Sequence, residues 1–208
     1  SRMDAALINF ANTKFTSGST PVKVTLFNMG IDTIKSATIN WTFNGVSQTP
    51  VNWTGVLATG ESDVVALGNV LPVPVKVNKL VAWVSNPNGG QDLDKGNDTT
   101  EYEEYMCNGR IAAGTYTVGG ANADFADPKE MQMALYTCGV ARPVTFKIRT
   151  GNYATLNMDG GIKGASRNSR ITIMADSAAK VVFDGGNGGT GVVFKNPLFC
   201  NFQGSHVV

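Results

Sequence analysis

The sequence predicts an all-β protein built in two parts, and three observations carry this prediction. Short runs rich in Val, Ile, Thr and Phe are separated by clusters of Asn and Gly, and the 208-residue chain contains 24 glycines. Such runs, bounded by turn residues, are typical of strands joined by tight turns. The pattern changes after about residue 106, and the second half repeats a set of apolar and glycine positions. We therefore expect two domains, residues 1–106 and 107–208.

The first half reads as a series of seven short strands. The clearest covers residues 37–44, where every second side chain is apolar (Ala37, Ile39, Trp41 and Phe43). Period-two alternation places one face on a core and the other in water. Asn44-Gly45 follows and suits a hairpin turn. Seven such strands predict a two-sheet sandwich, with strands near 5–10, 21–28, 36–44, 46–53, 62–67, 73–78 and 79–85.

Four segments of this half carry a resemblance to a known family. They are Phe27-Asn28-Met29-Gly30, the alternating strand 37–44 with Asn44-Gly45, the turn from Leu57 to Ser62, and the acidic turn from Asp92 to Asp98. Together they resemble the bacterial cell-adhesion-related (CARDB-like, immunoglobulin-like) domain over about residues 4–105. The resemblance implies an immunoglobulin-like spacer or adhesion module, in a family without known catalysis.

One convincing helix is predicted in the second half, over residues 127–136. Asp127 suits the N-cap, Pro128 the first helical position, and Glu130 completes a capping box. Gly139 is placed to end the helix. Strands are expected at 144–148, 155–158, 170–174, 181–183 and 192–194.

Positions in these strands recur at a spacing of 25 residues. Such a period fits one coil of a β-solenoid, in which each coil stacks on the last. The matched positions are Phe146 and Ile148 with Ile171 and Ile173, Leu156 and Met158 with Val181 and Phe183, and Gly160, Gly161 and Gly164 with Gly185, Gly186 and Gly189.

A second resemblance covers about residues 110–208. The segments 114–120, 138–146 and Gly151-Asn152-Tyr153 resemble the N-terminal entry of pectin-lyase-like right-handed β-helices in large secreted bacterial surface proteins. The family usually has Gly before the proline, where this chain has Arg142. The expected fold is thus an immunoglobulin-like β-sandwich followed by the first coils of a right-handed parallel β-helix, with a short N-terminal capping helix.

The ends and the charge of the chain limit which kind of protein and which partners are expected. The chain opens Ser1-Arg2-Met3 and stops at residues 204–208 inside an expected strand, so we expect a piece of a longer protein. The two resemblances imply that this protein is secreted or at the cell surface. The uncovered last coil predicts self-association through residues 192–208. Seventeen basic and 16 acidic residues form no basic stripe, which excludes a nucleic-acid partner. No apolar run reaches the roughly 18 residues of a transmembrane helix.

The chain has three cysteines, Cys107, Cys138 and Cys200. No Cys-x-x-Cys or Cys/His cluster accompanies them, which argues against zinc. Cys107 and Cys138 either form a disulfide across the start of the second half or remain two buried thiols, and the sequence leaves both alternatives open.

The acidic turn offers candidate calcium ligands, namely Asp92, Asp94, Asn97 and Asp98. Gly96 falls at the fifth loop position, one early for an EF-hand. The alternative is a turn stabilised by Asx side chains and followed by a solvated acidic linker. No other cofactor is expected.

Candidate catalytic groups do not assemble in the sequence. His206 is the only histidine and has no nucleophile-elbow motif beside it. Asp176, Asp184, Arg170 and Lys180 fall on the first two coils, and Asp184-Gly185-Gly186 reads more simply as a turn. Trp41 belongs to the inward row of its strand, so we expect it in the core. For Trp53 the sequence leaves two alternatives, a core position or a ring that stacks on a sugar.

The leading hypothesis is therefore a non-catalytic adhesion or display module of a bacterial surface or secreted protein, with a glycan or protein ligand. The alternative is the N-terminal fragment of a carbohydrate-active β-helix enzyme, a polysaccharide lyase or glycoside hydrolase, whose active site lies on missing coils.

Overall fold

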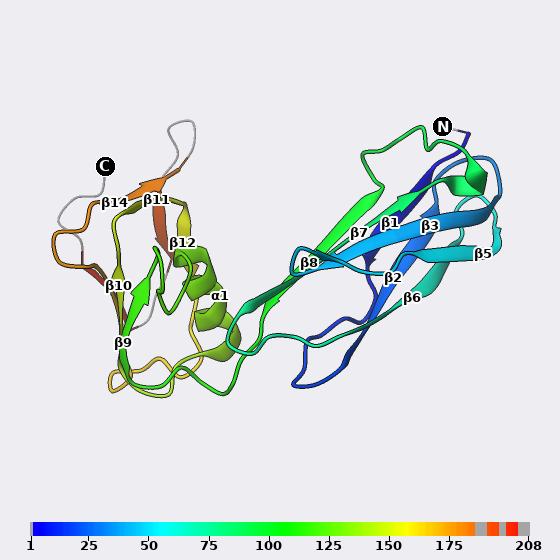
Figure 1. Cartoon of the computed structure of the whole chain (residues 1–208). Coiled ribbons are helices and arrows are strands. Elements are labelled where there is room, and N and C mark those ends of the chain that lie inside the picture. Colours follow the sequence, from blue (N-terminus) through cyan, green and yellow to red (C-terminus); the bar gives the residue numbers. More distant parts are fainter. Residues whose placement is uncertain (1, 186–190, 196–198, 204–208) are drawn as a thin grey trace. The chain divides into compact units, whose positions relative to one another are not determined.

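The computed structural model describes residues 2–185, 191–195 and 199–203 of the chain. The chain divides into two compact units, Ser1–Met106 and Cys107–Val208 (Figure 1). Both units consist mostly of strands. The predicted mostly-β fold with antiparallel sheets is confirmed, and each unit is described below by itself.

The first unit contains two antiparallel sheets. The first sheet has the order β1 (Ala5–Phe10), β2 (Thr20–Asn28), β6 (Ser62–Val70). The second has the order β4 (Val46–Ser47), β3 (Ile34–Phe43), β7 (Val77–Ser85), β8 (Thr99–Tyr105), and β5 (Val51–Leu57) also pairs with β3.

The two sheets share one apolar core. Val24 and Leu26 on β2 alternate with solvent-facing residues, as do Ile39 and Trp41 on β3, and all four are buried. Strands of this pattern are stable only when their apolar faces pack on one another, which gives a two-sheet sandwich. Trp41 lies in this core, as its alternation predicts.

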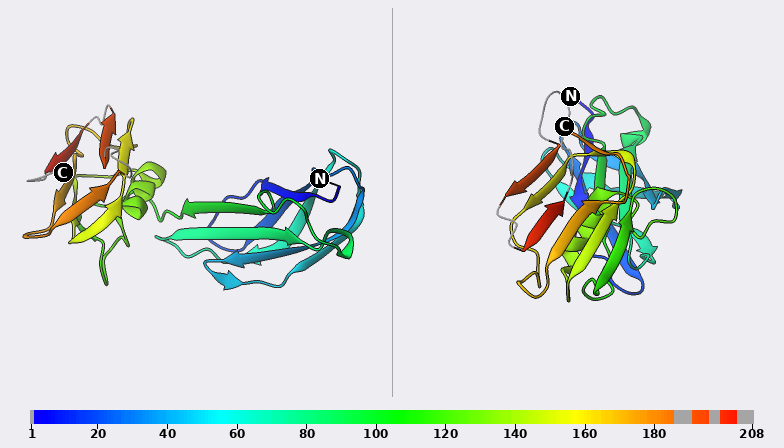
Figure 2. Two further views of the ribbon diagram at one scale, coloured as in Figure 1. Left: turned by 90° about the horizontal axis from the view of Figure 1, so that it is seen from above. Right: turned by 90° about the vertical axis from the view of Figure 1, so that its left-hand side faces the viewer.

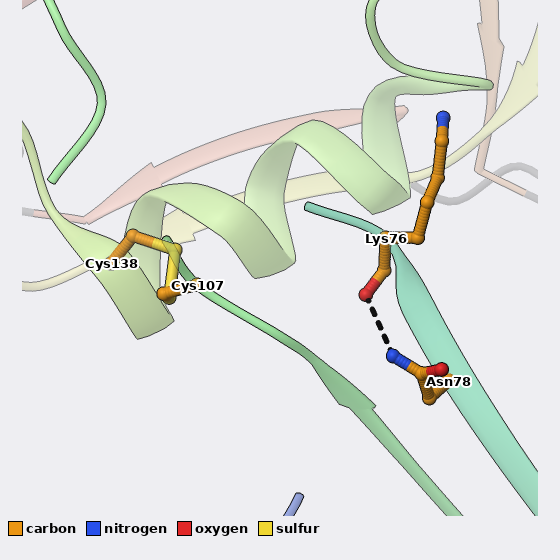
Figure 3. Close-up of a disulfide and its surroundings, with 4 residues drawn as sticks. All are labelled: Lys76, Asn78, Cys107 and Cys138. Atoms are coloured by element: carbon orange, nitrogen blue, oxygen red, sulfur yellow. Dashed lines mark hydrogen bonds between the residues drawn. A yellow bond between two sulfur atoms is a disulfide. The ribbon is translucent and has the colours of Figure 1, made fainter. Parts of the chain in front are cut away.

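Two strand predictions in the first unit are wrong. Residues 73–78 do not form a strand, because Pro72 and Pro74 lack the N–H that a ladder needs, and only Val77 and Asn78 belong to β7. The buried Asn78 side chain holds this loop instead: its Nδ2 donates to Val73 O (2.9 Å) and Lys76 O (3.2 Å; Figure 3).

The second error is that residues 99–105, read as an acidic linker, form the edge strand β8. Burial alternates along β8, but its partly buried positions are not all apolar. Tyr102 and Glu104 are partly buried, and Glu101 and Glu103 are exposed. Glu104 is partly buried because its carboxylate accepts hydrogen bonds from Tyr102 Oη (2.8 Å) and from Phe15 N (3.1 Å).

The second unit contains three short parallel sheets. One has the order β16 (Cys200–Gln203), β13 (Ile171–Ala175), β10 (Val144–Ile148), β9 (Gly114–Val118), and these strands lie side by side in the right-hand view of Figure 2. The others pair β11 (Gly151–Ala154) with β14 (Val181–Asp184) and β12 (Leu156–Asp159) with β15 (Val192–Lys195).

Strands do recur in this unit, but the predicted spacing of 25 is wrong. Val144 pairs with Ile171, 27 positions on, whereas Gly151 pairs with Val181, 30 positions on, and Leu156 with Val192, 36 positions on. The strands keep parallel register while the turns between them differ in length, so no single period describes the chain. Of the glycine matches, Gly186 and Gly189 lie outside the described residues.

Helix α1 (Pro128–Cys138) begins and ends near the predicted residues. Asp127 Oδ1 accepts from Glu130 N at 2.8 Å. Glu130 Oε2 accepts from Ala126 N, one residue before the N–H that a capping box uses. Gly139 ends the helix at φ 71°, and a Cβ there would lie 2.3 Å from Lys163 O, so only glycine fits. Across the residues described, no helix is long and apolar enough to span a membrane.

Candidate functional site

The acidic turn of the first unit is organised by its own side chains. Asp92 is 7% exposed; its Oδ2 accepts from Ala5 N (2.6 Å) and its Oδ1 from Asp94 N (3.0 Å). Asp94 Oδ1 accepts in turn from Gly96 N (3.0 Å). Two of the four calcium candidates thus act as acceptors for backbone N–H groups, which is the Asx-turn alternative stated above.

The other two candidates keep oxygens without a protein partner. Asn97 Nδ2 donates to Asp4 Oδ1 (2.9 Å), but Asn97 Oδ1 and Asp98 Oδ1 are buried and accept no hydrogen bond. Burial, and then the negative charges of Asp92, Asp4 and Asp94, raises the pKa of Asp98 to about 6. Among the described residues, no three His, Cys, Asp or Glu side chains are grouped so as to hold a metal ion.

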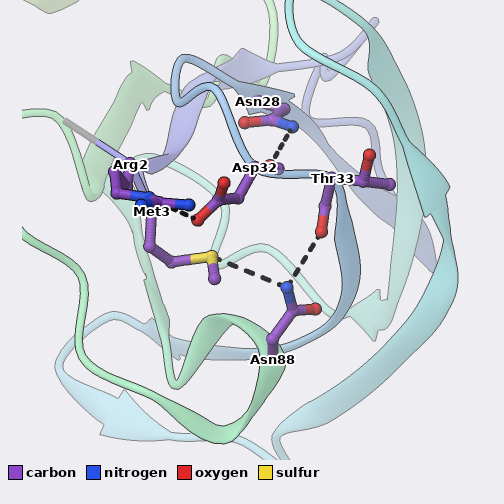
Figure 4. Close-up of polar contacts among 6 residues, drawn as sticks. All are labelled: Arg2, Met3, Asn28, Asp32, Thr33 and Asn88. Atoms are coloured by element: carbon purple, nitrogen blue, oxygen red, sulfur yellow. Dashed lines mark hydrogen bonds and ion pairs between the residues drawn. The ribbon is translucent and has the colours of Figure 1, made fainter.

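Loops beside this turn are fixed by a buried asparagine, Asn28, the last residue of β2. Its Nδ2 donates to Asp32 O (3.0 Å; Figure 4) and to Leu57 O (2.8 Å), and its Oδ1 accepts from Gly30 N (3.0 Å). One side chain therefore joins the β2–β3 loop to the end of β5. Because Asn28 is fully buried, losing it would leave backbone groups unsatisfied.

Asn88 performs the same task from the β7–β8 connection, where it lies at φ 51° in the short helix η1 (Pro87–Gly89). Its Oδ1 accepts from Lys35 N (2.6 Å) and its Nδ2 donates to Thr33 O (2.9 Å; Figure 4). Sequence reasoning gave Asn88 no role and placed Asn28 only within a motif. The available signal was the frequency of Asn at expected turns, a residue that tolerates positive φ and bonds to backbone.

An open groove lies beside the Asn28 network, with a volume of about 450 Å³. Asp63 Oδ2 accepts from Trp53 Nε1 (2.8 Å), and Glu61 Oε2 accepts from Ala58 N (2.8 Å). Both carboxylates are thus held in place on its wall. The lining residues are Trp53, Gly55, Val56 and Leu57 from β5, Glu61 just before β6, and Ser62 and Asp63 at the start of β6.

Trp53 does not offer a free ring face for sugar stacking. Its side chain belongs to the core and is 7% exposed, and a Cβ on Gly55 would lie 2.5 Å from its ring. The open question that the sequence left at Trp53 is therefore resolved toward the core. Its contribution to the groove is to orient Asp63.

In the second unit, a disulfide joins Cys107 to Cys138, the last residue of α1 (Figure 3). The S–S distance is 2.01 Å and the Cα atoms are 5.6 Å apart. Cys200 is the free cysteine of the described chain, and burial raises the pKa of its thiol to about 11. A thiol with so high a pKa is a poor nucleophile at neutral pH.

One of the four charged candidates of the enzyme alternative lines a groove of the second unit. A groove of about 340 Å³ is lined by Arg149, Thr150 and residues 176–179, and of the four candidates it contains Asp176 alone. Asp176 Oδ1 accepts from Ser177 N (2.9 Å) and lies 3.8 Å from Lys147 Nζ. Asp184 ends β14 and Arg170 precedes β13. His206 lies outside the described residues.

No protein-family model matches the sequence, and no curated protein matches it. Among solved structures, the crystal structure of a CARDB domain from Pyrococcus furiosus, in complex with di-metal ions, is 18% identical, covers 50% of this chain and 94% of its own, and has a TM-score of 0.42. The solution structure of that domain is 16% identical, covers 51% of this chain and 94% of its own, and has a TM-score of 0.36. A β-glucuronidase of glycoside hydrolase family 2 is 11% identical, covers 88% of this chain and 21% of its own, and has a TM-score of 0.34. Likenesses of this size do not establish a family.

Proposed function

We propose that the chain is a non-catalytic adhesion or display module of a bacterial surface or secreted protein. The first unit is its immunoglobulin-like binding domain, and the groove between β5 and β6 is the contact surface. The observation that carries the proposal is this groove, whose two carboxylates are fixed by Trp53 Nε1 and Ala58 N. β-sandwich domains commonly bind through loops at one end, held by a rigid scaffold.

The carboxylates of the groove support the binding of a cationic group. Glu61 and Asp63 are both exposed, and each accepts a hydrogen bond from an N–H group. Two carboxylates held in this way favour a cationic group of a ligand.

The second unit is proposed to be the opening coils of a right-handed β-helix that carries the binding unit. Its strands repeat in the order of three parallel sheets, and apolar residues stack between coils, as Val144 does with Ile171 and Phe146 with Ile173. Buried stacked rows of this kind are how solenoid coils cover one another.

A secreted or surface location is proposed on the disulfide. Cys107–Cys138 is an intradomain bridge at the entry of the second unit, and such bridges persist in oxidising compartments outside the cytosol.

The proposal is tested by probing an array of polysaccharides and extracellular proteins with the labelled chain, and by assaying the same polysaccharides for released sugar. We expect retained chain and no release above a buffer blank. The variant Val56→Asp/Glu61→Lys should lose binding, because Val56 is 71% exposed in the groove, whereas the control Val46→Asp, exposed on the short strand β4, should keep it. Sugar release would support the alternative, a fragment of a carbohydrate-active enzyme. Binding to no array member would contradict the adhesion role.

A further inference from the structure

The groove is bounded by two edge strands of the first unit. In the described structure β6 pairs with β2 alone and β5 with β3 alone. An edge strand presents a row of N–H and C=O groups that can pair with an added strand. The two edges differ in regularity, and this difference decides which one can accept a partner.

β6 is regular where it borders the groove. Its residues from Ser62 to Ala66 pair with β2 in unbroken register, and the bulge comes later, between Ala66 and Gly68. β5 is bulged at the groove itself, because Ile34 pairs with Leu57 and Ser36 with Thr54. A bulge disrupts the ladder and turns the strand away. The edge of β6 is therefore the one on which an extended segment fits.

Apolar side chains lie uncovered on both strands here. Val56 is 71% exposed and Val64 is 53% exposed, although both belong to strands. No lysine, arginine or proline protects β6 between Ser62 and Val70. Edge strands of soluble proteins usually carry protecting residues, and within β6 the charged Asp63 is the one such residue.

The charges of the groove define the partner. Glu61 directly precedes β6 and Asp63 is its second residue, so the two positions are two residues apart, an interval of about 7 Å in extended backbone. The groove lining contains no basic residue. Cationic side chains at alternate positions of an added strand would repeat at the same interval.

The same charges disfavour a second copy of this chain. Parallel in-register pairing of two β6 edges would place Asp63 of one copy opposite Asp63 of the other, and like charges opposite each other destabilise a strand pair. Antiparallel pairing over residues 62–66 would place Asp63 opposite Val65 of the other copy, where the carboxylate meets no cation. An inward-pointing charge on an edge strand is itself a device against self-pairing.

We propose that the free edge of β6 accepts an extended protein segment with Lys or Arg at alternate positions, as an added strand whose cations meet Glu61 and Asp63. This inference rests on the proposed binding function of the first unit and names its partner. Backbone pairing supplies affinity in this mode of recognition, and the alternate side chains supply specificity.

The test is a titration of the whole chain with the peptide Lys-Val-Lys-Val-Lys, blocked at both ends, by isothermal calorimetry. We expect binding, with the amides of residues 62–66 protected from hydrogen exchange, and no binding of Glu-Val-Glu-Val-Glu. The variant Glu61→Gln/Asp63→Asn should weaken binding at least tenfold, while the control Asp32→Asn/Asp94→Asn, carboxylates outside the groove, should change it less than twofold.

A peptide with N-methylated valines separates strand addition from simple charge attraction, because it keeps the cations and loses the backbone donors. We expect it to lose binding. Equal binding of the methylated peptide, or undiminished binding to the Glu61→Gln/Asp63→Asn variant, overturns the inference. If the peptide fails while the chain still binds the array through the groove, the proposed function stands and the partner class is wrong.

Discussion

Tyr136 on helix α1 donates a hydrogen bond from its hydroxyl to Asp159 O on strand β12, at 2.8 Å. One turn earlier, Gln132 Nε2 donates to Asn157 O. Leu156 N donates to Gly191 O, so the backbone groups of Leu156 face β15. The carbonyls of Asn157 and Asp159 therefore point away from β15. The helix thus satisfies two carbonyl groups on the edge of β12 that faces away from β15.

Removing these donors should loosen the second unit. We expect Gln132→Ala/Tyr136→Phe to lower its unfolding free energy by about 2 kcal/mol, roughly 1 kcal/mol for each lost bond. Hydrogen exchange at the β12 amides measures the change. Thr137→Ala, an exposed position of the same helix, serves as the control and should leave exchange unchanged. Identical exchange in both variants would refute the capping role of the two side chains.

Reduction of Cys107–Cys138 should destabilise the second unit. The two cysteines are 31 positions apart, and closing a loop of that length stabilises by about 3–4 kcal/mol in the chain-entropy model. The Cys107→Ser/Cys138→Ser variant should therefore unfold at lower denaturant. Mass spectrometry of non-reduced peptides should find the two cysteines linked. Alkylation of both thiols in the native protein would contradict the bridge.

Asp98 should make the first unit less stable as the pH rises from about 4 to about 6. The folded-state pKa of about 6 lies above the ordinary value of 3.8, so the folded form holds the proton more tightly. Its stabilising effect is present below the ordinary pKa and is lost as the pH rises through the folded value. Asp98→Asn should flatten this pH dependence and raise stability at pH 7.

Denaturant unfolding of the two proteins across this pH range checks the prediction. Asp159→Asn, a carboxylate of the second unit, is the control and should keep the slope of the first unit. An unchanged slope in Asp98→Asn would show that another group titrates. If added calcium removes the slope in the wild type, the acidic turn is a metal site.

Asn28→Ala should destabilise the first unit and free its loops. The change removes three hydrogen bonds of a buried side chain. Leu57 O and Asp32 O lose this donor, whereas Gly30 N keeps its bond to Asp4 O (3.2 Å). A loss of about 2–4 kcal/mol is expected. Asn9→Ala, which removes one exposed bond to Thr25, should cost far less. Equal stability of the two variants in denaturant titrations would contradict the role of Asn28.

The sequence could predict what depends on local periodicity. The inward row of β3, with Ile39 and Trp41, follows from alternation, and the start and end of α1 follow from Asp127 and Gly139. Turn length has no such local signal, which is why the repeat spacing was wrong although the strands were mostly found. β8 was missed because its buried positions include polar residues such as Glu104, whose burial depends on the distant Phe15 N.

The groove could not be predicted either, because it depends on contacts between residues of different sheets. Trp53 and Asp63 belong to different sheets, and only packing of those sheets brings Trp53 Nε1 to the Asp63 carboxylate. The sequence showed the turn from Leu57 to Glu61 but not what it lies beside. The loops fixed by Asn88 likewise depend on bonds to residues more than 50 positions away.

The most direct test of the central claim is to follow a film of the array-selected ligand on a quartz-crystal microbalance while the chain flows over it. The account predicts that the film gains mass for as long as the chain flows over it, and that the Val56→Asp/Glu61→Lys variant produces no such gain. After the chain is washed off, the film should return to its starting mass. A film that loses mass below its starting value would show that the chain degrades its ligand, and would contradict a non-catalytic binding module.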